Sequence, residues 1–418
     1  MNIALPGAPP ADPSSLPDPT TQRVVFDGAE GDFVTLSVRG ALLQLVTFGF
    51  YRFWLTTDVR RHLWTHTSAA GDHLEYTGRG RELLVGFLFA LAILVPIYLA
   101  YFLIGVEVER FQAFGSVPLG IFMLFFGQFA IYRARRYRLT RTVWRGVRFW
   151  MQGSGWAYAA RAFGWQILVV LSLGLAWPWR AAALERYKLR NTFYGDLAGS
   201  FDARASAFFR TGVWLWLAAL APVLILISAG AIYWATDETR PVLAGTIAAI
   251  GGVLFLPVPF LWPYFRAMEW RWWATGVRFG SLSVECDLRG GQLLKLYFKF
   301  FIIASLVSGA AAGAVFAIGA AVVEQLTKGG SGSMLESMSS AFESNQVLLV
   351  AGTTLGYLIV GLSVGVVQRY FLQREMWCIV ARSLTIRHID AAENVVARGE
   401  AANAIGEGLA DSLDVAGF

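Results

Sequence analysis

Long runs of apolar residues, separated by short polar segments, form the main pattern of this chain. A helix needs roughly 20 apolar residues to cross the hydrocarbon core of a bilayer. Six segments reach this length, some with help from their flanks, and predict transmembrane helices at about 83–105, 116–132, 207–234, 241–265, 296–323 and 347–369. Two further apolar stretches, 40–55 and 163–179, are too short or too interrupted for a full crossing.

Basic residues indicate which segments lie in the cytoplasm. Segment 133–148 contains seven Arg residues and no acidic residue, and segment 180–190 is also basic. The positive-inside rule places both in the cytoplasm. If 163–179 crossed the membrane, these two segments would lie on opposite sides, so we interpret it as an interfacial or re-entrant helix. We interpret 40–55 in the same way, because Arg60 and Arg61 follow it.

Both termini are then expected in the cytoplasm, and an eight-span arrangement is the alternative. Residues 23–38 contain β-branched and aromatic residues around Gly28 and Gly31, which predicts a short β-hairpin. The expected organisation begins with a disordered arm at 1–20 and a first repeat half with two spans at 21–148. A second repeat half with four spans at 149–390 and a cytoplasmic tail at 391–418 follow.

An internal repeat accompanies the apolar pattern. A group of four residues recurs after 125 positions, as Gly49, Trp54, Arg61 and Thr67 and then as Gly174, Trp179, Arg186 and Thr192. A partial copy lies 75 positions after Arg61, Thr67 and Gly71, as Arg136, Thr142 and Gly146. Weaker copies occupy 266–280 and 374–384. Each unit leads from an apolar helix through aromatic and basic residues to a turn and an extended piece, so we expect small β pieces together on the cytoplasmic face.

The expected fold class is therefore an all-α polytopic membrane protein. It has six transmembrane helices, two short interfacial or re-entrant helices and small cytoplasmic β pieces from the repeat. In the repeat, Trp side chains are suited to the level of the lipid headgroups, and Arg side chains are suited to binding phosphate oxygens. The alternative interpretation is structural: Thr would stabilise turns, and Arg would extend its charged end from an apolar surface into water. The candidate residues for a lipid-headgroup site or for the repeat motif are Trp54, Arg61, Thr67, Gly71, Arg136, Thr142, Gly146, Trp179, Arg186 and Thr192.

The two short helices carry a family resemblance. Their sequences are LVTFGFYRFW and LSLGLAWPW, and each is followed by a basic and aromatic segment with Thr, Gly and Phe. With these features the chain resembles the YjgN-like family of bacterial inner-membrane proteins of unknown function. The resemblance covers about residues 24–390. The first copy departs from the pattern, with Arg52 and Phe53 where the second has Pro178. The resemblance implies a multi-pass protein and supplies no catalytic residue.

Composition agrees with a membrane location. Hydrophobic residues make up 56% of the chain and charged residues only 15%, whereas soluble proteins have about a quarter charged residues. The net charge is +6. Because the Arg residues lie beside apolar segments and no nucleic-acid-binding motif accompanies them, we expect anionic membrane lipids as partners and no nucleic acid.

No constellation for catalysis or for a cofactor stands out. His62 and His66 would share a helix face near His73 and Glu75, but the repeat has Tyr, Asn or Arg at the positions that match the first two. We therefore expect no metal and no cofactor. The central parts of the predicted spans lack Asp, Glu, His and Arg, and phosphate-loop, zinc-protease and serine-hydrolase motifs are absent from the sequence. We therefore do not expect an enzyme.

Small residues recur at every fourth position in the fifth predicted span, where they would let helix backbones approach closely. We expect them to pack within the helix bundle, and a contact in a homo-oligomer is the alternative. The expected function is a structural or lipid-headgroup-engaging membrane component, and the alternative is a facilitator or channel for a small solute or ion. The packing residues are Ser305, Gly309, Gly313 and Ala317.

Overall fold

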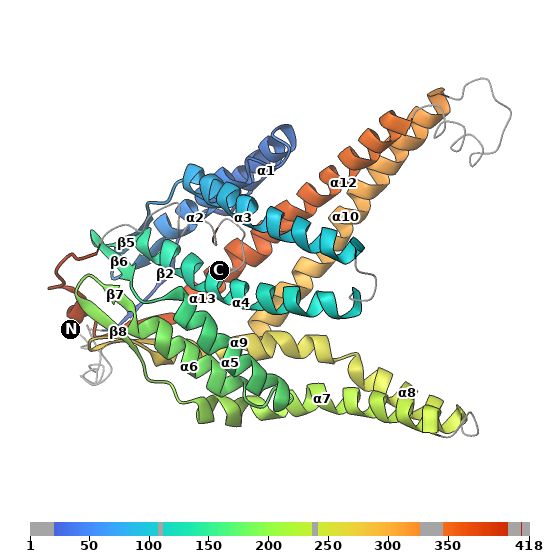
Figure 1. The fold of residues 1–418 in the computed structure, drawn as a ribbon. Helices are drawn as coiled ribbons and strands as arrows, with labels where there is room; N and C mark the ends of the chain where they lie inside the picture. The colour runs from blue at the N-terminus through green and yellow to red at the C-terminus, as the bar shows by residue number, and fades with distance from the viewer. Residues whose placement is uncertain (1–20, 108–111, 236–240, 327–345, 400–410, 412–418) are drawn as a thin grey trace, which may run out of the picture.

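The structure, a computed structural model, describes residues 21–107, 112–235, 241–326, 346–399 and 411. The expected arm 1–20 and most of the expected tail therefore lie outside the described residues. Figure 1 shows the strands gathered at one end of the molecule, while the long helices extend from them in the opposite direction.

Within the described residues, eleven antiparallel strands form a single sheet in the order β1-β11-β10-β9-β8-β7-β6-β5-β4-β3-β2. The two end strands are separated only by Val24, whose N–H donates to the carbonyl oxygen of Leu384 at 3.0 Å. The sheet is therefore a nearly closed barrel. The strands are β1 Gln22–Arg23, β2 Val25–Phe26, β3 Thr67–Ala69, β4 Asp72–Tyr76, β5 Thr142–Trp144, β6 Val147–Met151, β7 Thr192–Tyr194, β8 Leu197–Phe201, β9 Val277–Phe279, β10 Leu282–Cys286 and β11 Leu384–Arg387.

The predicted fold class, an all-α protein with small cytoplasmic β pieces, is wrong, because the strands form one nearly closed barrel. The physical reason lies in the strand edges. A hairpin of short strands leaves unpaired N–H and C=O groups on both sides. Pairing β4 with β5, β6 with β7, β8 with β9 and β10 with β11 satisfies these groups, and the segment from β1 to β2 covers the last two edges.

Helices make every second connection between neighbouring strands, and two-residue turns make the others. Since the strands are antiparallel, all helical connections leave from the same end of the barrel. The described helices are α1 Glu30–Val46, α2 Arg52–Thr65, α3 Gly80–Glu107, α4 Gln112–Thr140, α5 Gly155–Leu171, α6 Trp177–Arg190, α7 Ala205–Ala235, α8 Pro241–Phe255, α9 Val258–Gly276, α10 Gly290–Leu326, α12 Gln346–Gln368, the π-helix η3 Arg369–Glu375, α13 Met376–Arg382 and the 3-10 helix η4 Ile389–Ala392.

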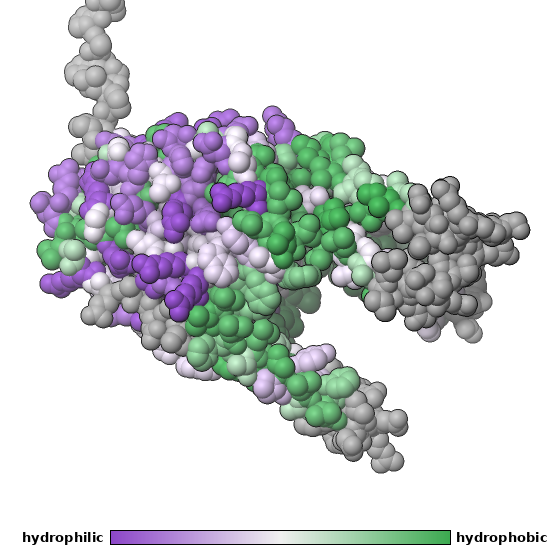
Figure 2. Space-filling model, turned by 90° about the horizontal axis from the view of Figure 1, so that it is seen from above, coloured by the Kyte–Doolittle hydropathy of each residue, from purple (hydrophilic) through white to green (hydrophobic). Residues whose placement is uncertain are grey.

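Six helical segments in the described parts of the chain are long and apolar enough to cross a membrane, as the hydropathy pattern predicted. At most 17% of each apolar window is buried inside the chain, so most of each apolar surface is exposed. Figure 2 shows them as hydrophobic arms with a hollow between them, opposite a hydrophilic end. The segments are Gly80–Leu103, Val117–Thr140, Ala205–Ala235, Val242–Gly276, Gly290–Ala321 and Val350–Arg382.

The stretches 40–55 and 163–179 are helix–turn–helix units, formed by α1 with α2 and by α5 with α6. At the two turns, the N–H of Gly49 donates to Gln44 O and that of Gly174 donates to Val169 O, both at 2.7 Å, which is the Schellman pattern. The hydroxyls of Thr47 and Ser172 accept from the N–H of the residue four positions later, the last residue before the next helix, and so stabilise the turn. Their interfacial or re-entrant placement stays a prediction.

The hairpin predicted for 23–38 is wrong, because α1 begins at Glu30. Its buried positions include Phe33, Ser37, Ala41 and Gln44, which follow the spacing of one helix face. That face explains why this segment is helical. Of the predicted hairpin only the two-residue strands β1 and β2 remain.

Candidate functional site

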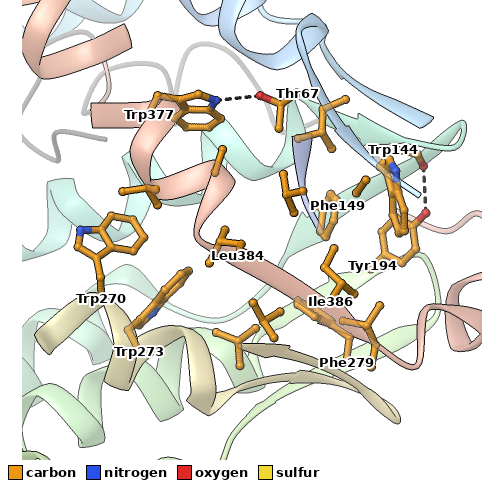
Figure 3. A pocket seen from close by; sticks show the side chains of 18 of the residues that line it. Thr67, Trp144, Phe149, Tyr194, Trp270, Trp273, Phe279, Trp377, Leu384 and Ile386 are labelled. Carbon is orange, nitrogen blue, oxygen red and sulfur yellow. Dashed lines mark hydrogen bonds between the residues drawn. The ribbon is translucent and has the colours of Figure 1, made fainter. Parts of the chain in front are cut away.

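The barrel encloses an apolar cavity of about 410 Å³. Residues two positions apart on a strand point to the same face, and such pairs from β3, β9, β10 and β11 line the cavity. Figure 3 shows these side chains directed toward one another across it. The strand residues that line it include Ala69, Leu74, Phe149, Phe279, Val284 and Ile386.

Helices cover the end of the cavity that faces the apolar arms. Trp270 and Trp273 come from α9, and Trp377 comes from α13. The indole Nε1 of Trp377 donates to Oγ1 of Thr67 at 2.8 Å (Figure 3). The three indoles therefore form the boundary of the cavity on its helical side.

Hydrogen bonds also satisfy two hydroxyls of the cavity wall, those of Thr67 and Tyr194. The hydroxyl of Thr67 donates to Leu63 O at 2.7 Å, and that of Tyr194 donates to Trp144 O at 3.0 Å. Burial raises the pKa of Tyr194 to about 12, so its hydroxyl stays protonated. The wall therefore presents its apolar atoms to the interior.

A second cavity of about 450 Å³ adjoins the first, and Trp270, Trp273 and Trp377 line both. We call it the basic vestibule, because cationic side chains outnumber carboxylates among the described residues that line it. The cationic residues are Arg135, Arg138, Lys188 and Arg266, and the acidic residues are Glu185 and Glu269.

Glu185 is the centre of the charge network in the basic vestibule. It pairs with Lys188 and with Arg135 at 3.5 Å, and it accepts from Nε1 of Trp273 at 3.1 Å. Burial raises the pKa of Glu185, but the charges of Lys188 and Arg135 outweigh burial, so its pKa lies below the ordinary value. Burial lowers the pKa of Lys188, and its bond with Glu185 opposes that effect. Glu185 is therefore a carboxylate at neutral pH, shared between two cations.

A third cavity of about 530 Å³ lies between the α5–α6 turn, α7 and α9. Its lining includes Trp216 and Trp262, and the Nε1 of Trp216 donates to Leu173 O at 3.0 Å. Arg266 and Glu269, which form an ion pair on α9, line both this cavity and the basic vestibule. The three cavities thus adjoin one another in a row.

A buried ion pair lies beside this row. Arg60 on α2 pairs with Asp411, and its Nη2 lies 3.2 Å from Oδ1. Arg138 reaches the same carboxylate at 3.4 Å, and the hydroxyl of Tyr76 accepts from Arg60 at 3.3 Å. Burial lowers the pKa of Arg60, but Asp411 and Tyr76 outweigh it and the pKa is raised. Asp411 was not predicted as a buried residue, because an acidic residue in a polar tail carries no local signal for burial.

The threonines of the repeat hold the helix-to-strand junctions. The hydroxyls of Thr67, Thr142 and Thr192 each donate to the carbonyl oxygen four positions earlier, at 2.7 to 2.9 Å. Thr142 also accepts from Nε1 of Trp64 at 3.1 Å. These bonds give the repeated threonines a structural role at the junctions, and a role in lipid binding stays a prediction.

The glycines of the repeat form the hairpin turns. Gly71 and Gly146 have φ of +80° and +73°, and Ala70 and Arg145 before them have φ of +55° and +50°. Two central residues with positive φ define the type I′ turn, which matches the twist of a hairpin. The predicted Gly positions therefore close β3 onto β4 and β5 onto β6.

The Trp and Arg residues of the repeat lie on the helices that lead into the barrel. Trp54 and Trp179 are exposed near the beginnings of α2 and α6, and Trp179 packs on Phe209 with ring centroids 5.3 Å apart. Arg61 is half exposed and donates to Gly78 O at 3.3 Å. Arg136 and Arg186 are half-buried on α4 and α6. A role of these residues in lipid binding stays a prediction.

The predicted packing residues Ser305, Gly309, Gly313 and Ala317 are exposed on α10. A Cβ placed on either glycine would meet nothing within 4 Å among the described residues, whereas one on Gly356 of α12 would lie 2.6 Å from Val315. The described contact between α10 and α12 therefore uses another face of α10, and a homo-oligomer contact of the small residues stays a prediction.

Two of the histidines noted in the sequence, His62 and His66, lie close together. The rings of His62 and His66 have centroids 4.3 Å apart, and Nδ1 of His66 lies 2.7 Å from the carbonyl oxygen of His62. Among the described residues, no group of three or more His, Cys, Asp or Glu side chains is placed to hold a metal ion. Burial lowers the pKa of His62, and the charges of His66 and Arg374 lower it further.

Comparison with known proteins yields a family for this chain. Residues 21–412 match the model of a family described as "bacterial protein of unknown function (DUF898)". No match was found among curated proteins or among solved structures.

Proposed function

This chain belongs to the DUF898 family of bacterial proteins of unknown function, the YjgN-like family that its sequence resembles, and we propose that it is an inner-membrane protein that engages anionic lipid headgroups. In this proposal the six apolar helices cross the membrane, and the barrel and both termini lie in the cytoplasm. The observation that carries the proposal is the band of Arg and Trp residues between the apolar arms and the barrel. Figure 2 shows the change from hydrophobic to hydrophilic surface at this level.

Two tryptophans on α7 support a membrane-spanning orientation for this helix. Trp214 and Trp234 are 74% and 84% exposed. Twenty residues separate them, which is roughly 30 Å at 1.5 Å per helical residue. A bilayer core has about the same thickness, and Trp is enriched at both of its interfaces. In this orientation Trp214 lies at the membrane–water interface on the side of the barrel.

Basic residues near that interface support contact with phosphate. Arg61, Arg136 and Arg186 lie on three helices, α2, α4 and α6, which all lead into the barrel. A guanidinium presents a fork of donors that matches phosphate oxygens, and a cytoplasmic leaflet carries anionic lipids. Several such groups at one level would favour anionic over zwitterionic headgroups.

The proposal is tested by lipid co-purification and by vesicle flotation with phosphatidylglycerol or phosphatidylcholine. We expect a variant with Arg61→Gln, Arg136→Gln and Arg186→Gln to lose its preference for phosphatidylglycerol, and the matching Lys variant to retain it. Arg145→Gln with Arg387→Gln is the matched control, because these residues lie near the hairpin turns at the opposite end of the barrel. An unchanged preference in the triple Gln variant contradicts the proposal.

The alternative function, a facilitator or channel lined by the short helices, stays a prediction. The two short units pack on different spans, since α1 contacts α12 and α5 contacts α4. Solute flux and conductance in proteoliposomes, compared with empty vesicles, would test it.

A further inference from the structure

The row of three cavities changes in chemical character along its length. The barrel cavity is lined by apolar atoms, whereas the basic vestibule beside it has charged groups, with an excess of cations, among aromatic and apolar side chains. Three indoles, those of Trp270, Trp273 and Trp377, lie on the boundary between them. An indole offers an apolar body together with one polar donor, so it suits such a boundary.

The size of the barrel cavity is typical of a site that binds a small ligand. Protein interiors are close-packed, and an empty apolar void forfeits the contacts of the side chains around it. Pockets that bind small ligands have volumes of about 300–1,000 Å³ and mostly apolar walls. At about 410 Å³ the barrel cavity lies in this range. Its walls offer few partners for water, so an apolar ligand fits it better than solvent does.

We propose that the barrel cavity and the basic vestibule form one binding site for an amphiphile with a single long apolar chain and an anionic head. The apolar chain lies inside the barrel between β3, β6, β9, β10 and β11. The head lies in the vestibule, where Arg135 and Lys188 already share the carboxylate of Glu185. A carboxylate or a phosphate would meet the same donors.

The third cavity supplies a route from the membrane to this site. It lies beside Trp216, two positions from the Trp at the proposed barrel-side interface, and it is lined mainly by aromatic and apolar side chains of α6, α7 and α9. The Arg266–Glu269 pair lies between it and the vestibule. A lipid from the adjacent leaflet would pass this pair to bring its head among the cations.

This inference rests on the proposed function for the origin of the ligand, but its test uses different residues. The full chain is purified in a neutral detergent. It is titrated with 11-(dansylamino)undecanoate, a fluorescent fatty acid, and with the corresponding alcohol, which has no charged head. We expect a blue shift and saturable binding for both probes, with tighter binding of the acid.

Ala69→Leu tests the chain-binding part, because Ala69 faces the barrel cavity. The larger side chain should weaken both probes about tenfold, the usual effect of overfilling a packed site. Ala198→Leu on β8 is the matched control, because Ala198 is exposed and its replacement should change neither affinity. Val284→Leu on β10 gives the same comparison if Ala69→Leu does not fold.

Arg135→Gln tests the head-binding part, since Lys188 still pairs with Glu185 in that variant. It should weaken the acid about tenfold, the loss expected for one hydrogen bond to a charged group, and leave the alcohol unchanged. Competition by hexadecanoate or by a lysophosphatidate then separates a carboxylate head from a phosphate head.

Equal affinities in the wild type, Ala69→Leu and Val284→Leu overturn the inference, as does failure of both competitors to displace the probe. Flotation on anionic vesicles keeps the two proposals apart. Ala69→Leu should keep that flotation, because the surface arginines are intact. If flotation shows no anionic preference while Ala69→Leu still blocks the probe, the proposed function fails and the cavity site stands.

Discussion

The indole of Trp377 and the hydroxyl of Thr67 are joined by a hydrogen bond of 2.8 Å across 310 positions of the chain. Trp377 lies in α13, near the C-terminal end of the last apolar segment Val350–Arg382, and Thr67 begins the β3–β4 hairpin. The bond therefore ties the end of the helical part to its beginning, where the barrel closes. The same threonine donates to Leu63 O and so holds the end of α2.

Thr67→Val should destabilise the protein, because Val keeps the shape of the side chain and removes the acceptor for Trp377 and the donor to Leu63. A lost buried hydrogen-bond partner costs about 1–3 kcal/mol. Thermal unfolding followed by Trp fluorescence measures the effect. Thr67→Ser is the control, since it keeps the hydroxyl and should lie closer to wild type. A Val variant as stable as wild type would show that the bond contributes nothing.

Asp411→Asn should be among the most destabilising single changes, because it leaves the buried guanidinium of Arg60 without its counter-charge. Breaking a buried ion pair from one side costs about 3–5 kcal/mol. The matched control is Asp58→Asn, which breaks the more exposed pair with Arg61 and should cost less than about 1 kcal/mol. Equal shifts in midpoint for the two variants would contradict this ranking.

Gly146→Ala should destabilise through the backbone alone. Gly146 has φ of +73°, and a Cβ there would meet nothing within 4 Å, so the effect is free of clashes. A side chain in this left-handed region costs about 1–2 kcal/mol. Gly31→Ala in α1 is the control, because it also has open space and should be neutral or stabilising by up to about 1 kcal/mol. The two changes should therefore shift the unfolding midpoint in opposite directions or by clearly different amounts.

His62 should make the protein less stable in mild acid. Burial lowers the pKa of His62, the charges of His66 and Arg374 lower it further, and Asp32 only partly opposes them. The folded state therefore keeps His62 neutral where the unfolded chain, with a pKa of about 6.5, already binds a proton. Stability is full above the unfolded pKa and falls as pH drops from there toward the folded pKa. His62→Gln should reduce this loss of unfolding midpoint, and an identical pH profile would refute the assignment.

Local properties of the sequence determined the six apolar helices. Each of the six apolar helices is recognisable by its own length and hydropathy, because a bilayer requires about 20 apolar residues in one continuous segment. The turns were recognisable for a similar reason, since the repeated Gly at 71 and 146 marks positions where the backbone takes positive φ. The family likewise followed from the repeated short helices.

Only the tertiary structure decided the barrel, the cavities and the buried ion pair. Strands of two to five residues are too short to show a period, and their partners lie far away in sequence, as when Gly199 pairs with Phe279. Closure also depends on Val24, which joins two edges that no local pattern relates. The burial of Asp411 against Arg60 depends on contacts across 351 positions. Sequence therefore sets which segments are apolar and where the chain turns, whereas the pairing of distant backbone edges sets which side chains enclose a space.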